Sequence, residues 1–319
     1  MFATLLGALP RPDGVQRDDD VVAVALSAQE AANLEPLTDG RMRDPVFASL
    51  IDGLLGQPSG PDPLAWWSAA ASQTGRAVKQ ALPGPYSVGW RAVPSGDWSA
   101  RWDAVRQAAD RLHQITTQLA AAGCPMVEIE ETEAQRIGAD PMERELFREA
   151  HERLARGVEG THLSLSIIGG AADQAGIETI LAAPYASLAV DLIAGPDNWN
   201  LVTRTPSDRG IVVGALSALT PEEPREVLLW GAHYAASTAG RGIDRVGLGS
   251  AGGWTSLTWD EAVRRMHTLG EAARLAGMPP SEELRRSLDP RAVSARRAAL
   301  GHGAPPAPRK PEPPKPEPR

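Results

Sequence analysis

Short runs of apolar residues alternate along the chain with longer segments in which apolar positions recur every three or four residues. This alternation is typical of repeated β-strand and α-helix units, in which helices cover a parallel sheet. Eight short runs occur, at residues 2–9, 34–40, 78–83, 126–131, 161–168, 186–193, 211–217 and 245–249. Eight such units predict an α/β protein with a single-domain (β/α)₈ TIM barrel.

The longer segments predict the helices between these strands. They lie at residues 100–122, 141–156, 174–182, 222–239 and 260–276. Thr258 is followed three residues later by Glu261, a spacing that predicts a capping box at the start of the last helix. Residues 41–76 contain several prolines and glycines, and we expect them to form a long loop over the end of the barrel.

The end of the chain has a different composition. Residues 302–319 contain eight prolines and no large apolar side chain, which predicts an extended, polyproline-like segment. We therefore expect a barrel over residues 1–299 and a disordered Pro-rich tail over residues 300–319. Two interpretations of the tail stay open, a solvated segment beside the acidic body and a ligand for a proline-recognition domain.

Composition and charge restrict the partners. Hydrophobic residues make up 42% of the chain, enough for a sizeable core, and the net charge of -8 argues against nucleic acid or an anionic membrane as the main partner. A small-molecule ligand fits better. The sequence has neither an apolar stretch long enough to span a bilayer nor a secretory signal, so we expect a cytoplasmic protein. Cys124 is the only cysteine, which excludes an internal disulfide and a thiolate-rich metal site within one chain.

Side chains on a barrel strand alternate between the helix layer and the interior. Once the apolar face of each strand is assigned outward, Gly247 and Gly249 take inward places and leave room for a ligand. The polar side chains predicted to face inward are Glu128, Glu130, His162, Ser164, Ser166, Ser187 and Asp191.

Three carboxylates and a histidine therefore converge on one interior: Glu128, Glu130, Asp191 and His162. Charged groups are costly to bury unless they meet cations or hydrogen-bond donors. Their clustering predicts a catalytic site in which burial and like-charge repulsion raise the carboxyl pKa values, or in which a cation binds. The alternative is a hydrogen-bonded polar cluster without chemistry.

Six short motifs occur in an order that resembles the cobalamin-independent methionine synthase-like family. Residues 4–12 (TLLGALPRP) resemble T-x-x-G-S-x-P-R, residues 37–41 (LTDGR) resemble T-D-G-E, and residues 82–85 (LPGP) resemble P-G-P. Residues 129–134 (IEETEA) resemble I-D-E-P-A, residues 161–164 (THLS) fall at H-x-C, and residues 248–253 (LGSAGG) fall at the segment ending in C-G-L. Over residues 2–277 the chain thus resembles the C-terminal catalytic domain of that family, within the uroporphyrinogen decarboxylase/methionine synthase TIM-barrel superfamily.

The resemblance implies a zinc ion held by histidine, a carboxylate and two cysteines, which binds a thiol as thiolate. His162 matches the histidine ligand and Asp191 falls at the carboxylate position, whereas Ser164 and either Ser250 or Ala251 replace the cysteines. A sulfur-rich zinc site is therefore excluded. At most, the resemblance predicts an incomplete site for a divalent metal, with His162 and Asp191 as its ligands.

The resemblance also implies substrate contacts. The family glutamate that holds the substrate amine corresponds to Arg41, and a guanidinium prefers a carboxylate or phosphate. We expect Arg41 to bind the substrate together with Glu128, Ser164 and Arg11. The residues expected to act in catalysis are His162, Glu130 and Asp191.

Three hypotheses of function stay open. The first is a divergent methyl- or alkyl-group transferase that acts on a small thiol or carboxylate, with a degenerate zinc site. The second is a metal-free lyase or decarboxylase, in which His162 and Glu130 exchange protons with the substrate. The third is a barrel that binds a small molecule without catalysis.

Overall fold

The computed structural model describes residues 1–57, 60–220, 222–279 and 281–289. Seven strands within these residues form one curled parallel sheet in the order β1-β7-β6-β5-β4-β3-β2. The strands are β1 (Phe2–Thr4), β2 (Gln80–Pro83), β3 (Met126–Glu131), β4 (His162–Ile167), β5 (Ser187–Asp191), β6 (Gly210–Leu216) and β7 (Val246–Ser250). Because all neighbours are parallel, the carboxyl ends of the strands lie at one end of the molecule, which we call the mouth.

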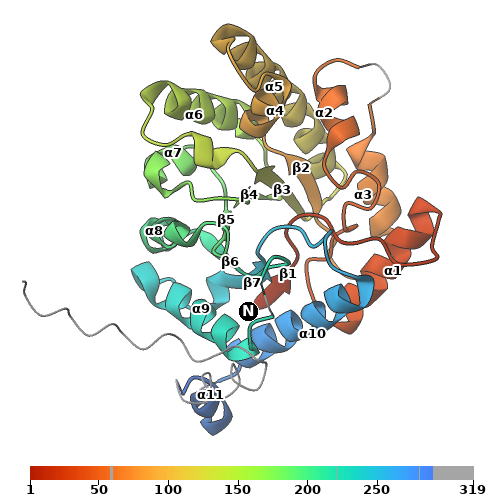
Figure 1. Cartoon of the computed structure of the whole chain (residues 1–319), viewed down its shortest axis with the longest axis vertical. Coiled ribbons are helices and arrows are strands. Elements are labelled where there is room, and N and C mark those ends of the chain that lie inside the picture. The colour runs from red at the N-terminus through yellow and green to blue at the C-terminus, as the bar shows by residue number, and fades with distance from the viewer. Residues whose placement is uncertain (58–59, 221, 280, 290–319) are drawn as a thin grey trace, which may run out of the picture.

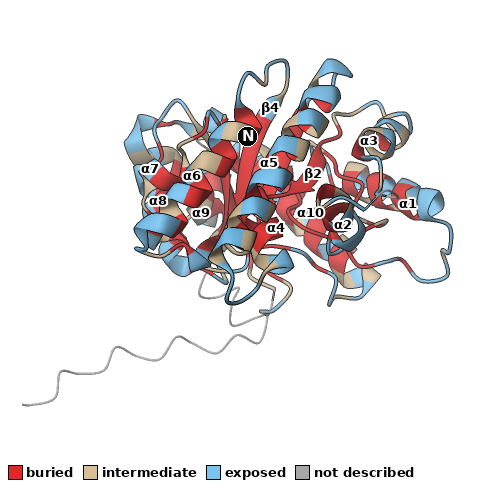
Figure 2. Ribbon diagram, turned by 90° about the horizontal axis from the view of Figure 1, so that it is seen from above, coloured by how far each residue is buried: buried red, intermediate tan, exposed pale blue. Residues whose placement is uncertain are grey.

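The helices form a ring around the outside of the sheet (Figure 1). They are α1 (Asp18–Ala31), α2 (Ala48–Leu54), α3 (Pro63–Ala71), α4 (Pro85–Ala92), α5 (Trp98–Ala121), α6 (Pro141–Ala155), α7 (Ile177–Ile180), α8 (Trp199–Arg204), α9 (Arg225–Ser237), α10 (Trp259–Ala276) and α11 (Glu282–Ser287). Figure 2 shows that buried residues occupy the strands and the sheet-facing sides of these helices. The expected α/β class with helices outside a curled parallel sheet is thus confirmed.

The second of the eight predicted strands, residues 34–40, is not a strand. It forms two isolated bridges, Glu35 opposite Ala3 and Leu37 opposite Val78, and so lies between β1 and the start of β2. Pro36 has no N–H to contribute to a ladder. The side chain of Gln29 replaces the missing strand neighbour, since its amide donates to Thr38 O at 2.7 Å and accepts from Thr38 N at 2.9 Å. The prediction of eight strands was wrong in this respect, and the described sheet has seven.

On β3, the side chains point inward and outward as alternation predicted. Val127 and Ile129 pack in the core shared with the helices, whereas Glu128 and Glu130 are buried on the opposite face. The space predicted at the inward glycines is not free. A Cβ at Gly247 would lie 2.4 Å from Phe2 Cζ, because the Phe2 ring fills this place.

Residues 41–76 contain two short helices instead of forming one long loop as predicted. They contain α2 and α3, and the Trp67 indole donates to Val78 O at 2.9 Å, which fixes α3 to the residues before β2. The predicted boundary at residue 299 and the predicted tail lie outside the described residues. Of the helices that the structure describes, none has the length and apolar character needed to cross a bilayer.

Candidate functional site

Asp39, Arg41 and Glu130 come together at the mouth. The Arg41 guanidinium donates from Nη1 to Glu130 Oε2 in an ion pair whose side chains are 10% and 1% exposed. The second carboxylate oxygen of Glu130 accepts from Gly7 N at 3.2 Å, and Asp39 Oδ1 accepts from Arg41 N at 2.8 Å. Segments that follow β1 and the bridge at residue 37 thus meet the end of β3, as expected for a site at the carboxyl ends of barrel strands.

Local contacts fix the position of Arg41. Its backbone has a positive φ of 53°, next to Gly40 at 70°, so the chain turns sharply here. The guanidinium carbon lies 3.7 Å from the centre of the Phe47 ring, a cation–π contact. Arg41 Nε and Arg43 Nη1 are buried N–H donors without a hydrogen-bond acceptor, and Arg43 Nη1 also lies 3.7 Å from Asp39 Oδ2 in an ion pair. Such donors at a mouth support binding of a ligand that brings an anionic oxygen.

Asp39 is the titratable group of this cluster that the inward-facing pattern missed. Burial raises the pKa of its carboxyl above the ordinary value, and the nearby charge of Glu130 acts in the same direction. The Arg41 N–H and the charges of Arg43 and Arg41 act against this increase without cancelling it. Asp39 stands within the T-D-G-R motif, in a segment predicted to be a strand, but the structure places it after the bridge at Leu37, outside regular strands.

Glu128 lies deeper in the interior and has its own cation. Lys79 Nζ is 2.8 Å from Glu128 Oε2, and the two side chains are 1% and 0% exposed. Burial raises the pKa of Glu128 against the lowering influence of Lys79. The predicted increase of a carboxyl pKa is thus confirmed for Glu128, with burial as the largest cause. The pattern of the sequence had not indicated Lys79, which stands one residue before β2.

His162 does not join the carboxylates at the mouth. It begins β4 at the amino end of the sheet, is exposed, and places Nε2 2.8 Å from Ser187 Oγ. The strand register puts Asp191 six residues further along the sheet, about 20 Å away at about 3.3 Å per residue. One metal ion cannot bind both side chains over that separation. The expected convergence of His162 with Asp191 is therefore not found.

Asp191 lies at the mouth, but its carboxylate is hydrogen-bonded to backbone N–H groups of the neighbouring loops. Its Oδ1 accepts from Ile193 N and Ala194 N, both at 2.9 Å, and its Oδ2 accepts from Gly169 N at 3.4 Å. These bonds organise the turn after β5. Arg11 is also separate from the cluster, since its guanidinium donates to Gln16 O at 2.6 Å and to Asp18 at 3.0 Å.

The two serines that stand at the expected cysteine positions are occupied by protein partners. Ser164 Oγ accepts from Ser187 Oγ at 2.9 Å. Ser250 Oγ accepts from Leu6 N at 2.7 Å and donates to Leu6 O at 2.9 Å, so it joins the end of β7 to the chain after β1. Within the described part of the chain, no group of three or more His, Cys, Asp or Glu side chains is arranged to hold a metal ion. These residues therefore do not fit the zinc ion that the resemblance implies.

A second buried network lies between the sheet and the helices. Glu131 accepts from Tyr86 N at 3.0 Å, from Ser87 N at 2.8 Å and from Ser87 Oγ, so it caps the start of α4. Its other partner is His151, whose Nε2 lies 2.9 Å away and whose Nδ1 lies 2.5 Å from the hydroxyl of Tyr185. Because all these groups are buried and Glu131 faces the helix layer instead of the interior, we interpret the network as structural.

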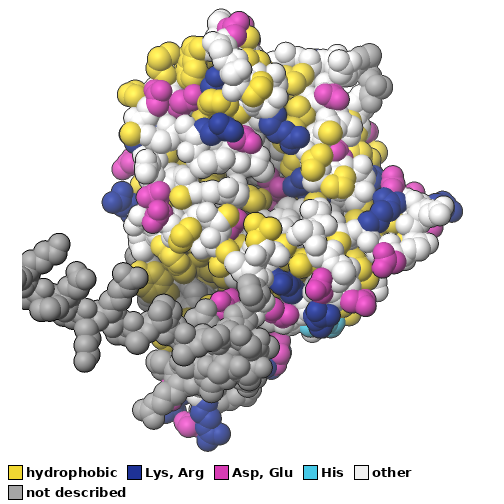
Figure 3. All heavy atoms as spheres, viewed as in Figure 1, with side chains coloured by type: hydrophobic (Ala, Val, Ile, Leu, Met, Phe, Trp, Pro, Cys, Tyr) yellow, Lys and Arg dark blue, Asp and Glu magenta, His cyan; other side chains and the backbone are white. Residues whose placement is uncertain are grey.

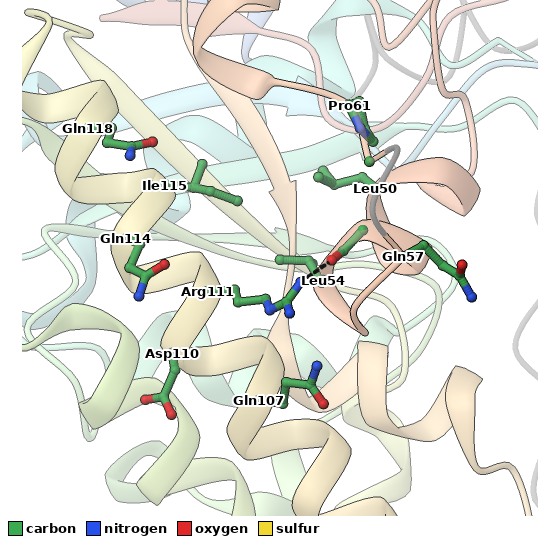
Figure 4. Close-up of a pocket in the computed structure, with 12 residues that line it drawn as sticks. Leu50, Leu54, Gln57, Pro61, Gln107, Asp110, Arg111, Gln114, Ile115 and Gln118 are labelled. Carbon is green, nitrogen blue, oxygen red and sulfur yellow. Dashed lines mark hydrogen bonds between the residues drawn. The ribbon is translucent and has the colours of Figure 1, made fainter.

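The cavity shown in Figure 4 is on the outer surface, between α2 and α5, and has a volume of about 840 Å³. Glutamine side chains of α5 line one side and Leu50 and Leu54 of α2 the other, and Arg111 donates to Gly53 O across it. None of the predicted site residues lies in this cavity.

The chain was compared with family models, with curated protein sequences and with solved structures. No family model matches the chain. A segment of 107 residues, 32% of the chain, is 34% identical to 5-methyltetrahydropteroyltriglutamate–homocysteine methyltransferases from two strains of Rhodopseudomonas palustris. This match spans only 13% of the length of each of those proteins.

Solved structures are similar over much more of the chain. A B12-independent methionine synthase from Shewanella sp. W3-18-1, in complex with selenomethionine, matches 86% of this chain and 96% of its own, with a TM-score of 0.71 and 14% identity. A methyltransferase from Methanosarcina mazei matches 85% and 94%, with a TM-score of 0.58 and 15% identity. The likeness to cobalamin-independent methionine synthases that the motifs predicted is thus confirmed, and this chain has their fold.

Proposed function

We propose that this chain is a methyl- or alkyl-group transferase that acts on a small anionic molecule at its mouth, without a zinc–thiolate centre. The observation that carries the proposal is the buried cluster of Asp39, Arg41 and Glu130 at the carboxyl ends of the strands. The fold supports the class of reaction, because similar structures include a methionine synthase and a methyltransferase.

Arg41 is the proposed substrate-binding group. A carboxylate of the ligand would accept from the guanidinium, whose Nε has no partner in the protein. This binding would draw Arg41 away from Glu130, because one guanidinium would then be shared by two anions. Glu130 would thereby become free to accept a proton.

Proton removal prepares the acceptor for transfer. Glu130 takes the proton of the acceptor thiol or hydroxyl, and the lone pair left on that atom forms a bond to the methyl carbon of the donor. The bond between the methyl carbon and the donor breaks as the new bond forms, and its electron pair remains on the donor. Asp39, whose pKa is raised by burial, then supplies a proton to the departing donor.

The same cluster also favours a second candidate, a metal-free lyase or decarboxylase. It contains an acid, a base and a cation within one mouth, and such a reaction needs no methyl donor. The two candidates differ in one measurable property. A lyase would convert a substrate or release carbon dioxide without any donor, whereas a transferase needs donor and acceptor together.

Ligand screening tests the proposed binding site. Small carboxylates, thiols, folates and methyl donors are tested by thermal shift, and hits are measured by calorimetry. We expect Arg41→Gln to weaken binding of a carboxylate ligand about tenfold or more, as for loss of a charged hydrogen bond. Glu149→Gln, which removes a charge from the outer face of α6, is the matched control and keeps the affinity. Equal affinities for Arg41→Gln and the parent protein would contradict the assignment of Arg41.

A further inference from the structure

An apolar groove of about 490 Å³ lies on the outside of the barrel between α8 and α9. Because α8 has only six residues, it leaves part of α9 and the end of β6 uncovered. Figure 3 shows hydrophobic side chains gathered over these two helices. The groove is lined mainly by Leu192, Ile193, Trp199, Val227, Trp230 and Tyr234.

Aromatic rings form the walls of this groove. The rings of Trp199 and Tyr234 meet edge to face with their centres 5.1 Å apart. Trp230 is 46% exposed and Tyr234 is 52% exposed. Exposed aromatic rings that lie together on a surface are typical of a binding site.

The described chain ends beside the same groove. The Trp230 indole donates to Leu288 O at 3.1 Å, and Asp289 is the last residue described. Thirty residues follow in the sequence. The stretch between Asp289 and Gly303 can span about 45 Å when extended, so residues beyond it can reach every part of the groove.

The chemistry of the following segment suits such a groove. Residues 303–319 contain eight prolines together with Arg309, Lys310, Lys315 and Arg319. Proline-rich segments bind grooves lined by aromatic rings, because the rings stack on proline side chains and little conformational entropy is lost. Indole and phenol groups can also donate hydrogen bonds to the free carbonyl groups of such a segment.

We propose that residues 303–319 bind as a polyproline II helix in the groove between α8 and α9 of the same chain. Attachment makes the event intramolecular, at an effective concentration in the millimolar range, so contacts that are weak in isolation are sufficient. The groove is then an internal docking site, distinct from the mouth.

Indole signals of tryptophan in nuclear magnetic resonance spectra test this proposal. The full chain is compared with a protein that ends at His302, to which a synthetic peptide of residues 303–319 is added. We expect the Trp230 indole signal to differ between the two proteins, and the peptide to shift it toward the full-chain position with a Kd of about 0.1–1 mM. A Trp230→Ala variant identifies the signal.

Two sets of variants distinguish binding in the groove from other causes. Tyr234→Ser, at an exposed ring that needs no refolding of the core, should weaken peptide binding at least about fivefold. Trp66→Ala, on α3, is the control and keeps the affinity. A peptide with alanine in place of every proline keeps all charges and should not bind.

Three results would overturn the proposal. The first is identical indole signals in both proteins with no binding of the peptide at several millimolar. The second is equal binding by the peptide that lacks proline, which would indicate attraction between charges only. The third is a full-chain signal that changes with protein concentration, which would show that the segment binds a second copy.

Discussion

The buried carboxyl of Asp39 makes stability depend on pH, because its charged form is unfavourable in the folded protein. Burial raises its pKa in the folded protein above that of the unfolded chain. Between these two pKa values the folded state binds more protons, so the contribution of Asp39 to stability falls as the pH rises through this window. Asn cannot ionise and carries no such penalty.

The Asp39→Asn variant should therefore gain stability relative to the parent protein as the pH rises from about 4 to 7. The free energy of unfolding of both proteins, measured in urea at several pH values, checks this. If the parent protein instead becomes more stable relative to Asp39→Asn over that range, the charges of Arg41 and Arg43 outweigh burial, and the pKa of Asp39 is lowered, not raised.

Lys79 and Glu128 are two buried charges that depend on each other. Lys79→Met leaves the Glu128 carboxylate buried without a cation, which should lower the free energy of unfolding by about 3–5 kcal/mol. The double variant Lys79→Met/Glu128→Leu removes both charges and should recover most of this loss. Urea unfolding of the parent protein, Lys79→Met, Glu128→Leu and the double variant measures the coupling, and a double effect equal to the sum of the two single effects would contradict the interaction between Lys79 and Glu128.

Glu131 joins three elements, β3, α4 and α6. Its carboxylate accepts from two backbone N–H groups at the start of α4 and contacts His151 of α6. Glu131→Ala leaves these groups buried and unpaired, so we expect a loss of about 3–5 kcal/mol in the free energy of unfolding.

The measurement is urea unfolding, followed by both fluorescence and far-ultraviolet circular dichroism. Glu149→Ala, at a partly exposed carboxylate of α6, is the control and should have little effect. A loss for Glu131→Ala as small as that of the control would show that the network does not stabilise α4.

The sequence predicted most of the long helices but missed α1 (Asp18–Ala31), and it was less accurate for short elements. The periodic segment at residues 260–276 became α10 (Trp259–Ala276), and Thr258 and Glu261 form the predicted capping box. Residues 34–40 instead depend on the side chain of Gln29, a partner from α1 that no local pattern reveals. Within residues 41–76, Asp62 followed by Pro63 is a start signal for α3, whereas α2 begins without a side-chain cap and has no such local signal.

For the candidate site, strand alternation predicted which faces of β3 are inward, and so found Glu128 and Glu130. It did not predict how far along its strand each side chain lies, between the amino and the carboxyl end of the sheet. His162 and Asp191 therefore looked like neighbours, although they lie near opposite ends of the sheet. Asp39 and Lys79 fall within the predicted strands at residues 34–40 and 78–83, but no inward face was assigned to either of these strands, and in the structure both residues lie outside regular strands.

At the scale of the molecule, the chain has a methionine synthase-like fold, but its described side chains do not form the zinc site that the resemblance implies. Ser250 and Ser164 bond to other protein groups, and His162 is remote from the mouth. We expect the purified protein to contain less than about one tenth of an equivalent of zinc, and its melting temperature to be unchanged by a chelator. Metal analysis by mass spectrometry and thermal unfolding test this. One equivalent of tightly bound zinc would contradict it.

The central claim, that the mouth transfers a methyl or alkyl group by means of Glu130, is tested most directly with a ¹³C-methyl-labelled donor and an acceptor found by ligand screening. Nuclear magnetic resonance follows the labelled methyl group in the presence of the parent protein, Glu130→Gln and the control Glu149→Gln. We expect the parent protein and the control to move the label to the acceptor, and Glu130→Gln to be slower by about a hundredfold or more, as for loss of a general base. Transfer at an equal rate by Glu130→Gln, or turnover of the acceptor with no donor present, would contradict the claim.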